Sequence, residues 1–358
     1  MKNKQYLIYS AVFLVLAGLV YLQFRSWQNF EWSKLWSQFR YLNLWRILFA
    51  IGLTYFAYIL RALRWKVLLR PVRKNVSVLG LIPPTLIGFT GLSLLGRPGE
   101  LIRPYLIARR ENLNLPSQLA VWAVERIFDF GGFALLLLSA IFLPKSDLHS
   151  FARTATPEVR HWILLTGDFL IALVVVLLSA VALISYRGNR IAQWIEQRFS
   201  HLSENLGHRI AQKVREFANG LDTIHGPLEF LQLSVLSVLM WSVIAFSYKQ
   251  VTLAYGDAMA AMSLAKLFPV VFSSMLGSMV QLPGVGGGSQ LATIVAFDRV
   301  FGIPREVAVS CGIMLWLVNF VAVVPVGLLL AHRERLSLRK LSKETAAAEE
   351  AEPAESTP

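Results

Sequence analysis

The sequence predicts an all-α polytopic membrane protein, and three observations support that fold class. Of its 358 residues, 55% are hydrophobic and only 16% are charged, with a mean hydropathy of +0.52. A typical soluble domain carries about 25% charged residues, so this chain lacks the charge that a soluble surface needs. The apolar residues also form long blocks, and the first block covers 19 uncharged residues at 6–24. A block of about 18 residues or more is typical of a transmembrane helix.

Six apolar blocks are long enough to be full transmembrane helices. They lie at about 6–24, 44–63, 117–143, 162–184, 228–254 and 305–331. The first is predicted to be a retained signal anchor, because it exceeds the roughly 7–15 apolar residues of a cleaved signal peptide and lacks a clear cleavage site. The stretch 27–42 is rich in Trp with interspersed charges, which is typical of a helix lying in the membrane interface.

The Lys and Arg residues predict the orientation of these helices. With both termini in the cytoplasm, 23 basic residues fall in inner segments and six in outer segments. The net charge of +13 is therefore attributed to orientation and to contact with anionic lipid, not to nucleic acid. The polar stretch 187–226 is predicted to be a cytoplasmic loop with an amphipathic helix. The transmembrane domain is predicted to cover 1–335, and 336–358 to be a disordered acidic tail.

Two further blocks, 78–110 and 264–301, are predicted to be re-entrant helical hairpins. Each has an apolar arm broken by proline, a Gly/Pro turn, a short second arm, and a proline before a full span. Two complete crossings in each block would leave the topology unchanged, so that alternative stays open. With the spans that follow, the hairpins form two repeat-like units of opposite orientation, 78–143 and 264–331. Such an inverted repeat is typical of secondary transporters, whose sites lie near the membrane midplane.

The turn of the first hairpin carries charges at a depth where a membrane protein usually avoids them. Arg97 and Glu100 lie in the turn GRPGE, and Arg103 follows in the second arm. Glu100 and Arg103 are three residues apart and share a helix face. Charges inside a membrane are costly unless they are paired or hydrated, and they indicate function. An internal salt bridge that fixes the hairpin is the structural alternative.

The span 117–143 carries three more ionisable residues. Glu125 and Asp129 are four residues apart on one face, and Arg126 reaches Asp129 at a spacing of three. These side chains must line a cavity or pair with hairpin residues such as Arg97 or Arg103. A buried structural network again remains the alternative.

The turn of the second hairpin is rich in glycine and has no charge. Successive backbone N–H groups followed by a helix N-terminus can bind an anion such as phosphate. Ser289 is expected to cap that helix. The turn matches neither a Walker loop nor a dinucleotide-binding motif, and a close-packed glycine turn is the alternative. The candidate residues in this turn are Gly284, Gly286, Gly287, Gly288, Ser289 and Gln290.

Signs of catalysis are weak. The six histidines do not have metal-ligand spacing, and no nucleophile motif is present. The single cysteine, Cys311, excludes an intrachain disulfide and a thiolate metal cluster. We therefore expect no catalytic residues, no metal and no cofactor, and we expect that the protein is not an enzyme.

The strings GRPGELIRPYLIARR, VERIFD and LPGVGGGSQ, followed by GIP before the last span, resemble the flippase-like transmembrane domain of lysylphosphatidylglycerol synthetases. The resemblance covers roughly 6–335 and implies a stand-alone inner-membrane domain that moves or binds a lipid. The family motif often continues to an acidic residue where this sequence has Gln290. No aminoacyl-transferase domain follows, so synthesis of an aminoacyl lipid is not expected. The resemblance assigns the family's charged motif positions to Glu100, Arg103, Glu125, Arg126 and Asp129.

Together these observations predict a lipid translocase or lipid-binding transporter of the cytoplasmic membrane. Its expected substrate is a phospholipid or polyprenyl-linked lipid with an anionic, phosphate-containing headgroup. One alternative is an accessory membrane subunit of a lipid-modifying enzyme. A less favoured alternative is a membrane-embedded enzyme that uses Glu125 or Asp129 as a base. The sequence predicts neither the lipid's identity nor the oligomeric state.

Overall fold

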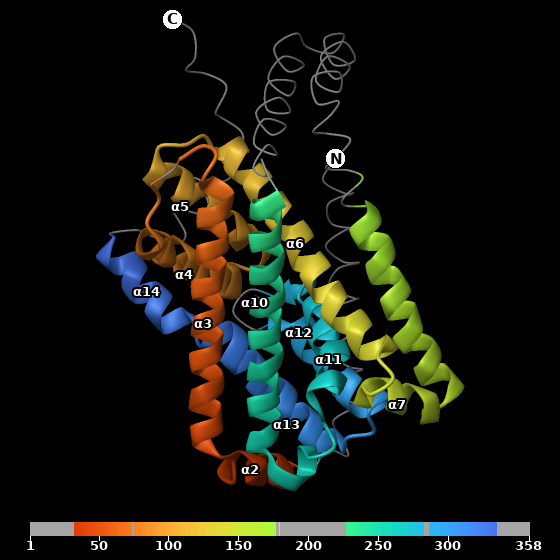
Figure 1. Ribbon diagram of the computed structural model, residues 1–358. Helices are drawn as coiled ribbons and strands as arrows, with labels where there is room; N and C mark the ends of the chain where they lie inside the picture. Colours follow the sequence, from red (N-terminus) through yellow and green to blue (C-terminus); the bar gives the residue numbers. More distant parts are fainter. Residues whose placement is uncertain (1–31, 74, 177–178, 180–226, 283–285, 335–358) are drawn as a thin grey trace, which may run out of the picture.

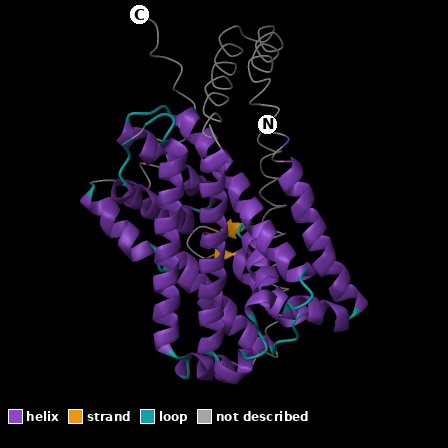
Figure 2. Ribbon diagram, in the orientation of Figure 1, coloured by secondary structure: helices purple, strands orange, loops and turns teal. Residues whose placement is uncertain are grey.

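The computed structural model describes residues 32–73, 75–176, 179, 227–282 and 286–334 (Figure 1). The predicted all-α class is confirmed, because helices make up nearly all of the regular structure (Figure 2). In the described part of the chain, one pair of two-residue strands interrupts them, β1 (Gln281–Leu282) with β2 (Gly286–Gly287). The predictions for 6–24, 187–226 and 336–358 lie outside the described residues.

Several helices are long and apolar enough to cross a membrane, which confirms a polytopic protein. Within the described residues, five single helices meet this condition: α3 (Leu44–Leu69), α4 (Val78–Leu95), Pro157–Val176, α10 (Pro227–Ala254) and Arg305–Arg333. A sixth candidate joins α6 (Leu115–Phe142) to α7 (Asp147–Thr154), with a bend of 57° between them. The interfacial stretch contains a helix, α2 (Trp32–Arg40), which packs against the last span.

Capping side chains fix where several of these helices start. Asn43 precedes α3 and accepts a hydrogen bond from the Arg46 backbone N–H at 3.3 Å. Asn114 does the same for the backbone of Ser117 at the start of α6, at 3.1 Å. Such a cap satisfies one of the backbone donors that have no partner within the helix.

The two predicted hairpins start at opposite ends of an antiparallel pair formed by α3 and α10. At one end the Asn43 backbone N–H donates to the Ala254 carbonyl at 3.2 Å. At the other end Arg70 Nη1 donates to Gln232 Oε1 at 2.8 Å. The first hairpin follows α3 at the Arg70 end, and the second follows α10 at the Ala254 end (Figure 1).

Each hairpin consists of two helices packed against each other. The first joins α4 to α5 (Ile102–Glu111) through a 3-10 turn, η1 (Arg97–Leu101). The second joins α11 (Leu264–Gly277) to α12 (Gly288–Val295) through the small strand pair. In an inverted repeat the two hairpins start from opposite sides of the membrane, and the starts at opposite ends of the α3–α10 pair agree with that requirement. Re-entrance and the repeat itself stay predictions.

The last span, predicted as one block, is one long helix that changes its hydrogen-bond pattern in the middle. Helix α13 (Arg305–Trp316) continues through a π-helical stretch, η4 (Leu317–Val321), into α14 (Val324–Arg333). Pro325 lies at the start of α14 and lacks the N–H that would continue the helical ladder. Side-chain hydroxyls donate to the backbone carbonyls in and just after the π-helical stretch, which satisfies carbonyls that the irregular helix leaves exposed. These bonds are Tyr55 to Ala322 (2.7 Å), Ser93 to Phe320 (2.6 Å), Tyr58 to Asn319 (3.3 Å) and Thr90 to Val323 (3.3 Å).

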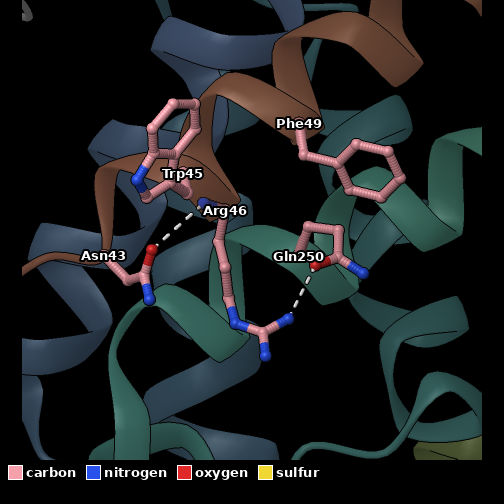
Figure 3. A pocket seen from close by; sticks show the side chains of 5 residues that line it. All are labelled: Asn43, Trp45, Arg46, Phe49 and Gln250. Carbon is pink, nitrogen blue, oxygen red and sulfur yellow. Dashed lines mark hydrogen bonds between the residues drawn. The ribbon is translucent and has the colours of Figure 1, made fainter.

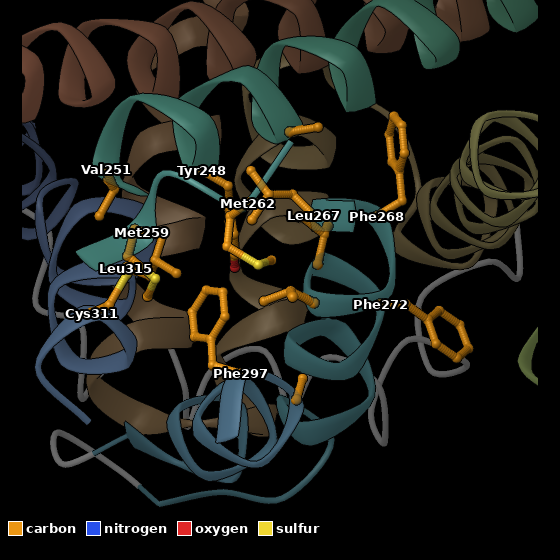
Figure 4. Packing of buried hydrophobic residues seen from close by; sticks show 14 of the residues in the cluster. Tyr248, Val251, Met259, Met262, Leu267, Phe268, Phe272, Phe297, Cys311 and Leu315 are labelled. Carbon is orange, nitrogen blue, oxygen red and sulfur yellow. The ribbon is translucent and has the colours of Figure 1, made fainter. Parts of the chain in front are cut away.

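A hydrophobic core holds the second hairpin against α10 and α13. Met259, Phe297 and Leu315 are buried there, and Cys311 is fully buried beside them (Figure 4). This packing holds α11 beside α6, and residues of α11, α3 and α6 line one cavity that contains buried charged side chains.

Candidate functional site

A buried ion-pair network joins α3 to α6. Arg64 of α3 lies between the two acids of α6, and its side chain is fully buried. Its Nη2 atom lies 3.0 Å from Glu125 Oε1, and its Nη1 atom lies 2.5 Å from Asp129 Oδ1. Nη1 also donates to Ser237 Oγ of α10 at 3.0 Å. A charge buried this deep is costly unless it is paired, and Arg64 has two carboxylates and a hydroxyl as partners.

The first hairpin docks onto this network through Arg103 of α5. Its guanidinium forms a two-pronged contact with the Glu125 carboxylate: Nη1 lies 3.1 Å from Oε1, and Nη2 contacts Oε2. The guanidinium also lies over the ring of Trp65, 4.3 Å from its centroid. A bidentate charge-assisted pair and a cation–π contact both fix orientation, so Arg103 locks the hairpin onto α6.

A glycine makes that docking possible. Gly88 of α4 faces Arg103, and a Cβ placed on Gly88 would lie 2.5 Å from Arg103 Cβ. Helices approach this closely only where one of them has no side chain.

Two further arginines form the outer part of the network. Arg126 Nη2 lies 3.0 Å from Asp129 Oδ2 and 3.3 Å from Glu125 Oε2. Arg61 Nη1 lies 3.8 Å from Asp129 Oδ2 and makes no hydrogen bond. Of the four arginines, Arg61 is therefore the one whose charge is least compensated.

The network has more cations than anions. Four guanidinium groups face the two carboxylates of Glu125 and Asp129. Glu100 of η1 lies close enough to stabilise the charge of Arg126, which brings the acids to three. When all seven groups are ionised, one positive charge remains in excess.

A cavity of about 470 Å³ lies against this network. Helices α3, α4, α6, α10 and α11 line it, together with η1, α5 and η4. One wall is charged. The side chain of Arg126 there is 28% exposed and that of Arg61 11%, whereas Arg64 and Glu125 are fully buried behind them. The charged wall consists of Arg61, Glu100, Arg103, Arg126 and Asp129.

The rest of the cavity is neutral. Apolar side chains alternate there with hydroxyl and amide groups, such as the Tyr248 hydroxyl, which donates to Ser274 Oγ at 3.0 Å. This wall includes the end of α11 and the π-helical stretch of the last span. Parts of both predicted hairpins therefore meet at one cavity. The polar residues of the neutral wall are Thr54, Ser93, Tyr248, Ser274, Ser278 and Asn319.

The first group of residues predicted from the sequence is largely brought together. Arg103, Arg126 and both acids of α6 form the network, and Glu100 lines the cavity beside it. Arg97 starts η1, and its side chain lies outside the described residues. The expected pairing with Arg103 is confirmed for Glu125, whereas Asp129 pairs with Arg61, Arg64 and Arg126.

Two members of the network, Arg61 and Arg64, were not among the site residues predicted from the sequence. Arg61 and Arg64 were counted among the basic residues of the cytoplasmic loops, but α3 continues to Leu69 and buries both. Without them and Arg103, the inner count falls from 23 to 20, so the predicted orientation is unaffected. One signal in the sequence could have pointed to them. Arg61 and Arg64 are three residues apart, so they share a face of α3, and such a pair can meet the two acids that share a face of α6.

The glycine-rich turn differs from its prediction. Gly287, with φ 113°, is the N-cap of α12, and Ser289 lies inside the helix, so the expected Ser289 cap is wrong. Glycine adopts this φ readily. The N-cap therefore lies two residues earlier in the chain than expected, at Gly287 instead of Ser289. The Gly287 N–H donates to Gln290 Oε1 at 2.9 Å, and the Gly288 N–H donates to the Val280 carbonyl at 3.0 Å.

Two amides of the predicted anion site are thus already bonded within the protein. Gly286 pairs with Leu282 in the strand pair, and Gly284 lies outside the described residues. None of the described residues at 286–290 lines the cavity. Across the described part of the chain, no group of three or more His, Cys, Asp and Glu side chains is placed to hold a metal ion.

This fold and site define a multi-pass membrane protein with an ion-pair network beside a cavity between its helices. The chain belongs to the family described as lysylphosphatidylglycerol synthase TM region, whose model matches residues 8–327. That match includes both hairpins and the whole network, and it relates the protein to lipid handling. No curated protein and no solved structure matched the chain significantly.

Proposed function

We propose that this protein binds the phosphate-containing headgroup of a membrane lipid in the cavity and moves the lipid across the cytoplasmic membrane. The observation that carries the proposal is the cationic excess at the cavity wall, where Arg61 has the least compensated charge. A membrane protein retains an unbalanced charge at this depth when it meets a charged ligand.

The chemistry of the wall suits a phosphate group. Guanidinium forks bind phosphate oxygens through two parallel hydrogen bonds. Arg61 and Arg126 are the network arginines with the largest exposed fraction, and both line the cavity. The buried carboxylates behind them hold the guanidinium groups in place, so little side-chain freedom is lost when a ligand binds.

The neutral wall suits movement of the headgroup. Its hydroxyl groups can exchange hydrogen bonds with a polar headgroup as it leaves the arginines, while the acyl chains remain in the hydrocarbon. The π-helical stretch of the last span contributes Asn319 and Phe320 to this wall. Such local departures from α-helical bonding occur frequently at functional sites. The proposal includes no catalytic step, and it keeps both termini in the cytoplasm.

Leaflet exchange in proteoliposomes tests the proposal. The full chain is reconstituted with an anionic phospholipid that has a fluorophore on one acyl chain, and an external reductant reports the fraction in the outer leaflet. We expect the protein to speed exchange and Arg61→Gln to slow it at least about tenfold, the loss of one charge-assisted contact. Arg110→Gln is the control, because Arg110 forms an exposed 3.4 Å pair with Glu334.

Exchange no faster than in protein-free vesicles would contradict the transport proposal. If the inactive chain copurified with a lipid-modifying enzyme, the role of an accessory membrane subunit would be favoured. Equal rates for Arg61→Gln and the wild type would remove Arg61 from the mechanism.

A further inference from the structure

A second cationic site lies at the opposite end of α3, in a groove that shares no residue with the central cavity. Its walls are Asn43, Trp45, Arg46, Phe49 and Gln250, and its volume is about 440 Å³ (Figure 3). Arg46 and Arg61 are 15 residues apart in one helix, which separates them by about 22 Å along its axis. The groove therefore faces the other half of the bilayer.

The cation in this groove is held in place, but its charge is not neutralised. Arg46 Nη1 donates to the neutral Gln250 Oε1 at 2.9 Å (Figure 3). None of the acidic side chains in the described ranges forms an ion pair with it. Lys249, which precedes Gln250, adds a second positive charge that repels Arg46. The guanidinium thus keeps donors and positive charge for an anion from outside the protein.

The surroundings of Arg46 place it at a membrane interface. Trp45 is 81% exposed and Tyr41 is 87% exposed, beside the start of α3. Exposed Trp and Tyr side chains are typical of the headgroup level of a bilayer. One helical turn deeper, Phe49 meets Phe246 of α10 edge to face at 6.3 Å, and both rings are largely exposed.

The groove therefore has a cation at headgroup depth, a flanking indole, and an aromatic wall that continues toward the hydrocarbon. These groups follow one another in the same order as the parts of one phospholipid, from its phosphate to the upper part of an acyl chain. We infer that Arg46 binds the phosphate of a single anionic phospholipid in this leaflet, whose acyl chain lies against Phe49 and Phe246. The site rests on its own residues and does not depend on transport through the central cavity.

A matched pair of variants tests this inference. Arg70 lies at the other end of α3 and donates to Gln232 Oε1 at 2.8 Å, just as Arg46 donates to Gln250. Arg46→Gln and Arg70→Gln therefore remove the same charge and the same kind of hydrogen bond. Both proteins are reconstituted in phosphatidylcholine nanodiscs with increasing phosphatidylglycerol, and native mass spectrometry counts the anionic lipids that stay bound.

We expect Arg46→Gln to lose one tightly bound phosphatidylglycerol, with an affinity at least about tenfold weaker at that site. Arg70→Gln should keep the wild-type count. Arg46→Lys retains the charge without the fork and should show an intermediate affinity. Equal losses in both glutamine variants would show nonspecific attraction to anionic lipid and overturn the site, as would an unchanged count in Arg46→Gln. Arg61→Gln alters the central cavity and not this groove, so adding Arg46→Gln to it should still remove one further phosphatidylglycerol. Loss of that further lipid in a protein that does not speed leaflet exchange would support this site while contradicting the proposed transport.

Discussion

The two helical hairpins have similar shapes but different chemistry. The first, from α4 to α5, presents Glu100 and Arg103, and Arg103 bonds directly to Glu125 of the next span. The second, from α11 to α12, has an uncharged turn. There the Gln290 side chain accepts a hydrogen bond from the Gly287 N–H, and the Val280 carbonyl accepts one from the Gly288 N–H. Its contribution to the cavity comes from hydroxyl and apolar side chains such as Ser274 and Met275.

This difference shows that similar hairpins can divide the work of one site. The first hairpin completes a charged wall that has an affinity for anions. The second supplies a neutral wall over which a polar group can move without being held by a fixed charge. Variants in the first hairpin and its ion pairs should therefore affect binding and stability together, whereas variants in the second turn should affect stability alone.

The largest effect is expected for Glu125→Gln. Glu125 pairs with Arg64, Arg103 and Arg126, so its loss leaves several buried guanidinium groups without compensation. Removing one partner of a buried ion pair costs about 3–5 kcal/mol. Chemical unfolding in detergent should show a loss of that size. The control is Glu111→Gln, which breaks the more exposed pair with Arg73 and should cost about 1 kcal/mol or less. Equal costs for the two variants would show that the network does not stabilise the fold.

An intermediate effect is expected for Gly88→Ala. The added methyl group would collide with Arg103 Cβ and push α5 away from Glu125. Overpacking of this kind costs about 1–3 kcal/mol. Headgroup affinity, measured by titration of the purified protein with a short-chain anionic lipid, should fall as well.

The matched change in the second hairpin is Gly277→Ala, which would press against the backbone of Gly288. It should lower the unfolding free energy by a similar amount and leave headgroup affinity unchanged. A loss of affinity in this variant equal to that in Gly88→Ala would contradict the division between the hairpins.

The smallest effect is expected for Gln290→Ala. It removes the acceptor for the Gly287 N–H, and loss of a helix cap costs about 1 kcal/mol. Gln290→Glu keeps an acceptor at the N-terminus of α12 and should restore the thermal midpoint. Headgroup affinity should stay constant in both variants. An increase in affinity for Gln290→Ala would show that the freed amide binds the anion, as the sequence first suggested.

The two acids of α6 could be predicted as site residues from the sequence, because it shows both their spacing and their position in an apolar block, where an unpaired charge is energetically costly. Glu125 and Asp129 lie four residues apart in an apolar block, where only a nearby cation makes them tolerable. Arg103 was an expected partner for that reason. Arg64 was not, because basic residues at the end of an apolar block resemble an interface anchor. The acids that stabilise it belong to another helix.

Backbone detail was harder to predict than charge. The sequence around Ser289 matches a capping pattern, but the positive φ of Gly287 starts the helix earlier. The π-helical stretch before Pro325 lies in an unbroken apolar block, and its carbonyls accept hydrogen bonds from Tyr58 of α3 and Ser93 of α4. Those partners are more than 200 residues away along the chain, so local patterns carry no trace of them.

Photocrosslinking tests the central claim most directly. A phospholipid with a photoreactive group next to its phosphate is incorporated with the full chain into vesicles, activated, and located by peptide mass spectrometry. The account predicts crosslinks in the peptides that contain Arg61 and Arg126, with the Arg61 signal lost in Arg61→Gln. Crosslinks confined to the glycine-rich turn at 281–290, with none at the charged wall, would contradict it.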